Sequence, residues 1–480
     1  MSANRELISL TATQAVAKLR RREISPLELV EASLERIAET DGRLNAVPTV
    51  CAERAREAAR RIVAAAPATG PWPEHGIGLL AGLPLAVKDL NDVAGVRTTY
   101  GSPIFADHVP DRSDIMVETL ESSGGIVIGK SNTPEFGAGA NTYNEVFGET
   151  VTPWNTALTC GGSSGGSAAA LAAGQVWLAT GSDLGGSLRT PASYCSVVGL
   201  RPTPGRVANG PNELPFNTLS VEGPMARNVD DVALMLDAMV GWHIDDPMSL
   251  EPPAGSFRAA AARRTLPGRV AVSPDLGGIT PLDPEVRAAV EGAARRFAEL
   301  GVPVEEACPD FSGAAEAFKT LRALGFATSM KPLYDAHRDK LKPEVIWNIE
   351  HGLSLDVETI GRAERLRGAL YRDVAQFFRK YDLLLCAAAC VPPFDVKIRW
   401  LRELDGVTFD NYVEWIRITY AVTLTSCPAI SVPCGFTADG RPIGVQMVGR
   451  PRGEAALLAA AAAFEDTTGL AALVPIDPRP

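Results

Sequence analysis

Short apolar runs that alternate with helix-forming segments restrict the fold of this chain most strongly. From residue 82 onward each run is long enough for a buried strand but too short for a core helix. Alternation of this kind is typical of an α/β sheet covered by helices on both faces. We therefore predict an α/β fold with a large twisted mixed β-sheet. The runs expected as strands are 83–87, 126–129, 175–180, 269–272, 383–388, 429–433 and 442–449.

Helix signals frame these strands. Ser25-Pro26-Leu27-Glu28 is a capping box with proline at the first helical position, which predicts a helix over 26–39. Asn228 should cap another helix, and Asp283 a third. The remaining helices are expected over 12–22, near 114–122 and 165–173, and in the alanine-rich segment after 449.

Composition and charge exclude several functional classes. The net charge of −11 opposes nucleic-acid binding. The longest apolar stretches, such as 455–464, fall short of the roughly 20 residues that span a bilayer. Charges interrupt the N-terminal segment, and eight scattered cysteines suit reduced thiols. We expect a cytoplasmic protein that binds neither nucleic acid nor a membrane.

Residues 124–131, GGIVIGKS, match the phosphate-binding pattern G-x4-G-K-[ST]. A phosphate-binding loop must curl so that its N–H groups converge, and it must open into a helix. Ile126-Val127-Ile128 instead favours extended strand, and Pro134 follows soon after. We predict a strand here and no nucleotide site.

Residues 162–166, GSSGG, match the nucleophile elbow G-x-S-x-G. That elbow needs a strand running into it, whereas the preceding TPWNTALTC is predicted to be turn-like. It also needs a catalytic histidine. The five histidines, at positions 75, 108, 243, 337 and 351, have no supporting context. The pattern therefore does not indicate an α/β-hydrolase.

The most specific stretch is the Gly/Ser-rich segment 161–207, GGSSGGSAAALAAGQVWLATGSDLGGSLRTPASYCSVVGLRPTPGRV. It resembles the signature of the amidase signature family of serine hydrolases. Other family landmarks follow in the expected order over residues 6 to about 466: VKDL at 87–90, GKSNTPEF at 129–136, GPMAR at 223–227 and PAISVPCGF at 428–436. The resemblance implies one domain over 1–480. N-terminal helices occupy 1–65, the α/β core occupies 82–310 and 381–480, and a mostly helical section, 311–425, covers the substrate pocket.

The resemblance also implies residue roles. The serine that ends Asp-x-Gly-Gly-Ser, Ser187, is the nucleophile, Ser163 is the bridging serine after a cis peptide, and Lys88 is the base. The amides of Leu184, Gly185, Gly186 and Ser187 form the oxyanion hole. Ser182, Asp183 and Arg189 support that loop, and Gly137, Ala138 and Gly139 line the acyl pocket. No metal or cofactor is implied, since no cluster has ligand spacing.

The chemistry explains these residue types without the family. A serine hydroxyl attacks a carbonyl only if a base accepts its proton, and a lysine serves when burial makes its neutral form accessible. Lys88 follows Leu83, Leu85 and Val87 at a strand end, a desolvated position. The role requires its pKa to fall by roughly two to three units.

We therefore expect an amidase that hydrolyses a carboxylic amide, aryl amide, hydrazide, carbamate or ester of a small molecule. A homodimer is compatible with such a chain. One alternative is the amidase subunit of glutamyl-tRNA amidotransferase. Those subunits typically have Met-Asp-Glu-Phe where this chain has Thr133-Pro134-Glu135-Phe136, which disfavours it. A second alternative is a catalytically silent binding protein of the same fold, and the complete Ser-Ser-Lys triad argues against it.

Overall fold

The computed structural model describes residues 3–67, 70–73 and 77–480. Within these residues, eleven strands form one mixed sheet. In their order across the sheet, the strands are β1 (Thr49–Val50), β3 (Ile126–Ser131), β2 (Pro84–Lys88), β8 (Leu178–Asp183), β10 (Val221–Ala226), β9 (Val198–Arg201), β16 (Ala429–Phe436), β17 (Pro442–Gly449), β13 (Leu383–Ala387), β11 (Val270–Val272) and β12 (Val304–Glu306).

Two parallel groups of strands flank an antiparallel centre. β2 pairs in parallel with β3 and β8, and β11 pairs in parallel with β12 and β13. The strands from β8 through β10, β9, β16 and β17 to β13 pair antiparallel. Because β2 and β8 are parallel neighbours, their last residues, Lys88 and Asp183, lie at the same edge of the sheet.

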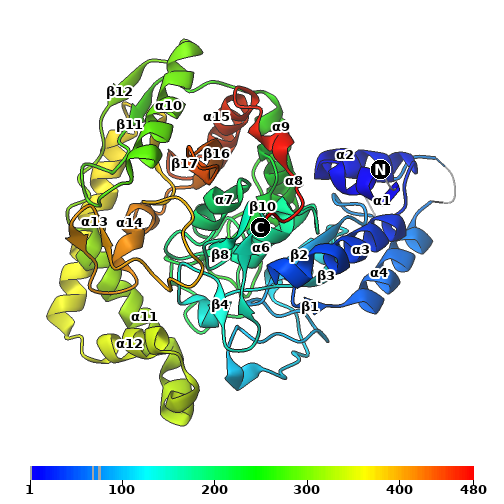
Figure 1. Cartoon of the computed structure of the whole chain (residues 1–480), viewed down its shortest axis with the longest axis horizontal. Helices are drawn as coiled ribbons and strands as arrows, with labels where there is room; N and C mark the ends of the chain where they lie inside the picture. Colours follow the sequence, from blue (N-terminus) through cyan, green and yellow to red (C-terminus); the bar gives the residue numbers. More distant parts are fainter. Residues whose placement is uncertain (1–2, 68–69, 74–76) are drawn as a thin grey trace.

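Helices cover both faces of the sheet, as expected (Figure 1). Side chains of β2 alternate between two buried clusters: Leu85 and Val87 belong to one, and Ala86 belongs to the other. The helices before the site are α1 (Ala3–Ser9), α2 (Ala12–Arg21), α3 (Pro26–Leu44), α4 (Ala52–Ala65), α5 (Ile115–Ser122), α6 (Gly165–Ala172) and α7 (Arg189–Cys195).

The later helices include the long ones that pack beside the site. In Figure 1, α11 and α12 lie on the side of the molecule opposite α1 to α4. These later helices are α8 (Val229–Met239), α9 (Phe257–Ala262), α10 (Pro284–Glu299), α11 (Ala314–His337), α12 (Pro343–Leu353), α13 (Val357–Phe377), α14 (Arg417–Leu424) and α15 (Glu454–Asp466).

Most predicted elements are confirmed by the structure. Ser25 and Glu28 form both bonds of the capping box, and Asn228 and Asp283 cap α8 and α10. The segment 124–131 contains strand β3, as predicted against a phosphate-binding loop. The predicted strand 175–180 is shifted to β8 (Leu178–Asp183).

One local prediction was wrong. The segment before Ser163 is not merely turn-like, because Asn155–Thr159 forms strand β7, which pairs with β6 (Val151–Thr152). This pair is a separate two-stranded sheet, as are β4 (Tyr143–Asn144) with β5 (Gly148–Glu149) and β14 (Glu403–Leu404) with β15 (Val407–Thr408). No strand of the main sheet therefore leads into Ser163. No helix in the described part of the chain is long and apolar enough to cross a membrane.

Candidate active site

Lys88 is the buried centre of the site. It ends β2, its side chain is fully buried, and its backbone N–H donates to Thr180 Oγ1 at 2.9 Å. Its Nζ lies 2.7 Å from Ser163 Oγ and 2.9 Å from both Ser164 Oγ and Ser182 Oγ. Three hydroxyls surround the nitrogen, so it can donate to them as an ammonium or accept a proton from one of them as an amine.

A second buried lysine at the adjacent strand end shows how unusual this environment is. Lys130 of β3 is also fully buried, but its Nζ lies 3.1 Å from Asp89 Oδ1 and donates to Asn91 O and Thr98 Oγ1. Within the described residues, no carboxylate lies within ion-pair distance of Lys88 Nζ. Burial lowers the pKa of both lysines, to about 7 for Lys88, where the charges of Glu222 and Asp183 act in the opposite direction. Lys88 thus reaches its neutral form more easily than an ordinary lysine.

Glu222 is the carboxyl group that most affects Lys88. It lies on β10 directly opposite Ser182 of β8, is buried, and has one carboxyl oxygen, Oε2, without a hydrogen-bond partner. Burial raises the pKa of Glu222, and the charge of Lys88 opposes that rise. The two groups therefore titrate together: a protonated Glu222 favours a neutral Lys88.

Ser187 lies in the loop between β8 and α7, next to the segment that carries Ser163. The backbone N–H of Ser164 donates to Ser187 O at 3.3 Å, which joins the two segments directly. The Gly162–Ser163 peptide bond is cis, as the resemblance implied. Ser163 is 2% exposed, whereas Ser187 is only half-buried, so Ser187 is the more accessible of the two hydroxyls.

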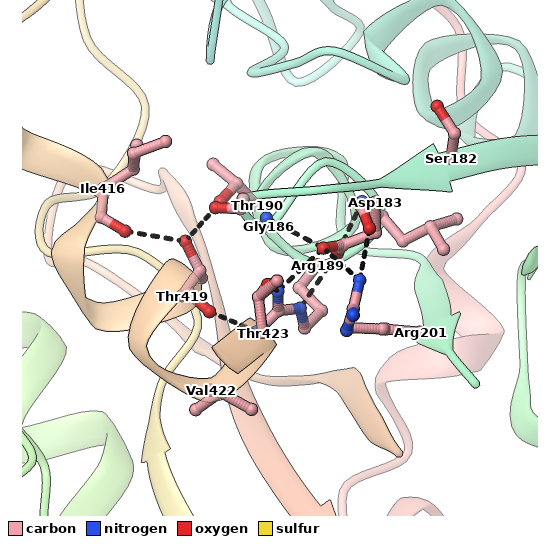
Figure 2. A network of polar contacts seen from close by, with 12 residues as sticks. Ser182, Asp183, Gly186, Arg189, Thr190, Arg201, Ile416, Thr419, Val422 and Thr423 are labelled. Atoms are coloured by element: carbon pink, nitrogen blue, oxygen red, sulfur yellow. Dashed lines mark hydrogen bonds and ion pairs between the residues drawn. The ribbon is translucent and has the colours of Figure 1, made fainter. Parts of the chain in front are cut away.

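A buried ion pair holds the loop that carries Ser187. Arg189 donates from Nε to Asp183 Oδ2 at 2.9 Å and from Nη2 to Asp183 Oδ1 at 2.8 Å. Figure 2 shows that Arg201 approaches the same carboxylate and that Ser182, the preceding residue, points to the other side of β8. Burial alone would raise the pKa of Asp183, but the Arg189 guanidinium outweighs that effect and holds it well below its usual range.

Arg189 also ties the loop to α14 and β17. Its Nη1 donates to Thr419 O at 2.9 Å and to Gln446 Oε1, and its Nη2 donates to Thr423 Oγ1 at 3.0 Å. Bidentate pairing with additional backbone and side-chain acceptors fixes a guanidinium in one orientation. The predicted supports Asp183 and Arg189 thus contact each other, whereas Ser182 contacts Lys88 instead.

The four loop amides predicted as oxyanion donors differ in the structure. The Gly186 N–H donates to Asp183 Oδ1 at 2.9 Å, so this amide is already paired. The N–H groups of Leu184, Gly185 and Ser187 have no acceptor within the described residues. Gly186 has a φ of +118°, and a Cβ there would lie 2.3 Å from Thr419 Oγ1, so only glycine fits beside α14.

These side chains line a cavity of about 80 Å³. Its polar wall contains Ser163, Ser182, Ser187 and Ser220, and the other lining residues are Leu90, Phe136, Gly137, Gly139, Leu184, Gly185, Arg322, Phe326, Tyr412 and Ile416. A larger cavity of about 690 Å³ beside α8 and α9 contains none of the predicted site residues. The chemistry therefore belongs to the smaller cavity.

The predicted pocket segment 137–139 divides between two environments. Gly137 and Gly139 line the cavity, but Ala138 is fully buried beside Phe326 and Met330 of α11, in a separate apolar cluster. Ala138 does not line the cavity because its side chain packs away from it. At Gly137, φ is +68° and a Cβ would lie 3.5 Å from Ser163 Oγ, so a larger residue would disturb Ser163 as well as the pocket.

Histidine takes no part in this arrangement. None of the four described histidines, His108, His243, His337 and His351, lines the cavity. His75 lies outside the described residues. Lys88 is therefore the basic side chain nearest to the serines.

Comparison with known proteins identifies the family. The family model described as Amidase matches residues 28–458. The chain belongs to the amidase family. An acylamidase from Rhodococcus erythropolis is 34% identical over 461 residues, covering 95% of each chain. The crystal structure of a bacterial aryl acylamidase of the amidase signature family has a TM-score of 0.88, with 28% identity and 97% coverage of both chains.

This amidase is a hydrolase that acts on carbon–nitrogen bonds in amides. A subunit of the glutamyl-tRNA(Gln) amidotransferase from Moorella thermoacetica is also similar, with 35% identity over 487 residues, which cover 96% of this chain and 97% of that protein. Overall identity therefore does not separate the two kinds of relative, and residues at the site must do so.

Sequence analysis of this amidase missed several groups that contact the site. Ser164 contacts Lys88 as closely as Ser182 does, and Glu222 and Arg201 lie on β10 and β9. Neither strand was predicted, because Gly199 interrupts β9, and Gly223 and Pro224 interrupt β10. Only the pairing of β8 with β10 brings Glu222 near Lys88.

We expect Glu222→Gln to lower the pKa of Lys88 further, by roughly one unit, because it removes a nearby negative charge that favours the ammonium form. The titration of isotope-labelled lysine side chains by NMR measures this pKa without reference to turnover. Glu465→Gln is the matched control, since Glu465 is another buried carboxyl with a raised pKa but binds the backbone of Val229. An unchanged Lys88 midpoint in Glu222→Gln, or an equal shift in both variants, would contradict this coupling.

Proposed function

We propose that this protein hydrolyses a carboxylic amide by way of an acyl-enzyme on Ser187, with Ser163 as proton relay and Lys88 as general base. The observation that carries the proposal is the 2.7 Å contact between Ser163 Oγ and the fully buried Lys88 Nζ, in the same cavity as the more accessible Ser187. A base of lowered pKa beside a serine provides the arrangement that nucleophilic catalysis requires.

In the first half of the reaction, the Ser187 oxygen bonds to the substrate carbonyl carbon. The hydroxyl proton passes to Ser163, whose own proton passes to neutral Lys88. The carbonyl oxygen becomes an oxyanion, and we assign its donors to the three unpaired amides, those of Leu184, Gly185 and Ser187. Preorganised amides of this kind typically contribute a few kcal/mol to transition-state stabilisation.

In the second half, the carbon–nitrogen bond breaks and the leaving amine takes the proton from Lys88 through Ser163. Water then attacks the acyl-enzyme by the same route, which releases the acid and restores Ser187. The buried Asp183–Arg189 pair acts through the loop rather than on substrate, since it orients the amides and Ser187. Gly186 serves this orientation by donating to Asp183.

We further propose that the acceptor is water and that the enzyme acts alone in the cytoplasm, on an amide or a related acyl compound. Amides, aryl amides, hydrazides, carbamates and esters all present the same electrophilic carbon to Ser187. The acylamidase relative and the aryl acylamidase structure support an amide of this kind. The residues Thr133 and Pro134 support hydrolysis over ammonia transfer to a partner subunit.

Ser187→Ala should remove turnover of the best amide or anilide substrate by about a thousandfold or more, because no acyl-enzyme forms. It should also abolish covalent labelling by a fluorophosphonate probe. Ser220→Ala is the matched control: Ser220 lines the same cavity but has no contact with Lys88, so this variant should still be labelled. Turnover by Ser187→Ala near the wild-type rate would exclude the proposed nucleophile.

Lys88→Arg tests the general base, because a guanidinium stays charged at every usable pH and cannot accept the proton. We expect a loss of kcat of about a thousandfold. Lys130→Arg is the control at the adjacent strand end, since Lys130 acts as a charge beside Asp89 and an arginine can keep that role. The general-base assignment fails if Lys88→Arg is folded, as judged by circular dichroism, and turns over substrate as well as Lys130→Arg does.

A further inference from the structure

Arg322 of α11 is a buried cation in the wall of the cavity. It is 7% exposed and lines the same cavity as Ser163 and Ser187. Its Nε donates to Asn348 Oδ1 at 3.1 Å and its Nη2 donates to the Tyr412 hydroxyl at 2.8 Å. Within the described residues, its Nη1 has no hydrogen-bond acceptor, and no carboxylate lies within ion-pair distance of the guanidinium.

Tyr412 adds a second unused donor beside Arg322. Its hydroxyl oxygen accepts from Arg322 Nη2 and, at 2.6 Å, from Asn348 Nδ2. A tyrosine hydroxyl has one proton to donate, and both accepted bonds leave that proton without a described acceptor. Tyr412 also lines the cavity. This part of the wall therefore offers donors only.

A second buried cation lies behind the neighbouring wall. Lys342 Nζ is buried without a hydrogen-bond partner, and a Cβ on Gly139 would lie 3.5 Å from it. Two carboxylates near Lys342 are already bonded: Glu135 accepts from Ser102 Oγ and the Lys342 backbone, and Glu344 accepts from the Tyr143 hydroxyl. The positive charges on this side thus face the cavity without a direct anionic partner.

Leaving cations in this state is costly, because buried charges are almost always paired. The rings of Phe326 and Tyr412, 4.8 and 5.7 Å from the Arg322 guanidinium, offset part of that cost. They satisfy none of its N–H groups. A ligand that brings two acceptor oxygens would satisfy both Arg322 Nη1 and the Tyr412 hydroxyl.

We infer that Arg322 and Tyr412 bind a carboxylate of the substrate, so that the enzyme selects amides that carry a carboxylate close to the bond that is cut. The inference rests on the proposed function and names the substrate class of that same site. The cavity is small, so the carboxylate and the scissile carbonyl belong to one short molecule.

The test compares matched substrates that differ only in this charge. On the acyl side, the 4-nitroanilide of succinic acid is compared with its methyl ester and with butyric 4-nitroanilide. On the amine side, N-acetyl-4-aminobenzoate is compared with its methyl ester. We expect the wild-type enzyme to prefer the carboxylate member of at least one pair by about 10- to 100-fold in kcat/KM, the range of a charge-assisted hydrogen bond.

Arg322→Gln should reduce this preference to near unity, mainly through KM, and Arg322→Lys should restore part of it. Arg399→Gln is the control, because Arg399 lies over the same Tyr143 ring as Lys342 but does not line the cavity. It should keep the wild-type preference. A binding measurement on Ser187→Ala, by calorimetry with the charged substrate, separates recognition from turnover and should show the same loss in the Arg322→Gln, Ser187→Ala double variant.

The outcomes distinguish the inference from the proposed function. If the wild-type enzyme cuts the neutral anilides and shows no preference in either pair, the carboxylate inference is wrong and the proposed function stands. If Arg322→Gln slows both members of a pair equally, Arg322 is a structural residue and the inference is also wrong. If no charged or neutral substrate acylates Ser187, the proposed function itself fails.

Discussion

The account of this protein depends on the burial of Lys88 among three serine hydroxyls with no carboxylate in contact. Desolvation lowers its pKa, and hydroxyl groups, unlike a carboxylate, do not restore it. Lys130 at the adjacent strand end keeps a direct bond to Asp89 and shows the alternative. The same sheet thus holds one lysine as a fixed charge and another as a group that can exchange its proton near neutral pH.

Sheet topology brings the other groups to Lys88. β2 and β8 are parallel neighbours, so the loop that follows Asp183 begins at the edge where Lys88 ends. Alternation along β8 then separates two roles: Ser182 points toward Lys88, whereas Asp183 faces Arg189 on the other side (Figure 2). One strand end therefore supports both the proposed base and the loop that carries Ser187. Long-range contacts of Arg189 with α14 and β17 fix that loop from the far side of the sheet.

Much of this could be predicted from the sequence, because the signature segment is local. Lys88, Ser163, Ser187, Asp183 and Arg189 all follow from short motifs, and the cap residues place the principal helices. Glu222 and Arg322 could not be found in this way. Glu222 reaches the site only through the pairing of β10 with β8, and glycine and proline hide that strand from any pattern. Arg322 lies among ordinary helix residues, and only the packing of α11 on the cavity reveals its missing partner. Ala138 illustrates the converse, since adjacency to two pocket glycines does not place its side chain in the pocket.

The most direct test of the central claim is the pH dependence of covalent labelling by a fluorophosphonate probe, with the modified residue identified by mass spectrometry. This measurement follows activation of the serine itself, without binding or release of a natural substrate. The account predicts that the label lies on Ser187 and that its rate rises about tenfold per pH unit below a midpoint near pH 7, then levels off as Lys88 becomes neutral. A label on another residue, or a rate that stays constant between about pH 5.5 and 9, would contradict it.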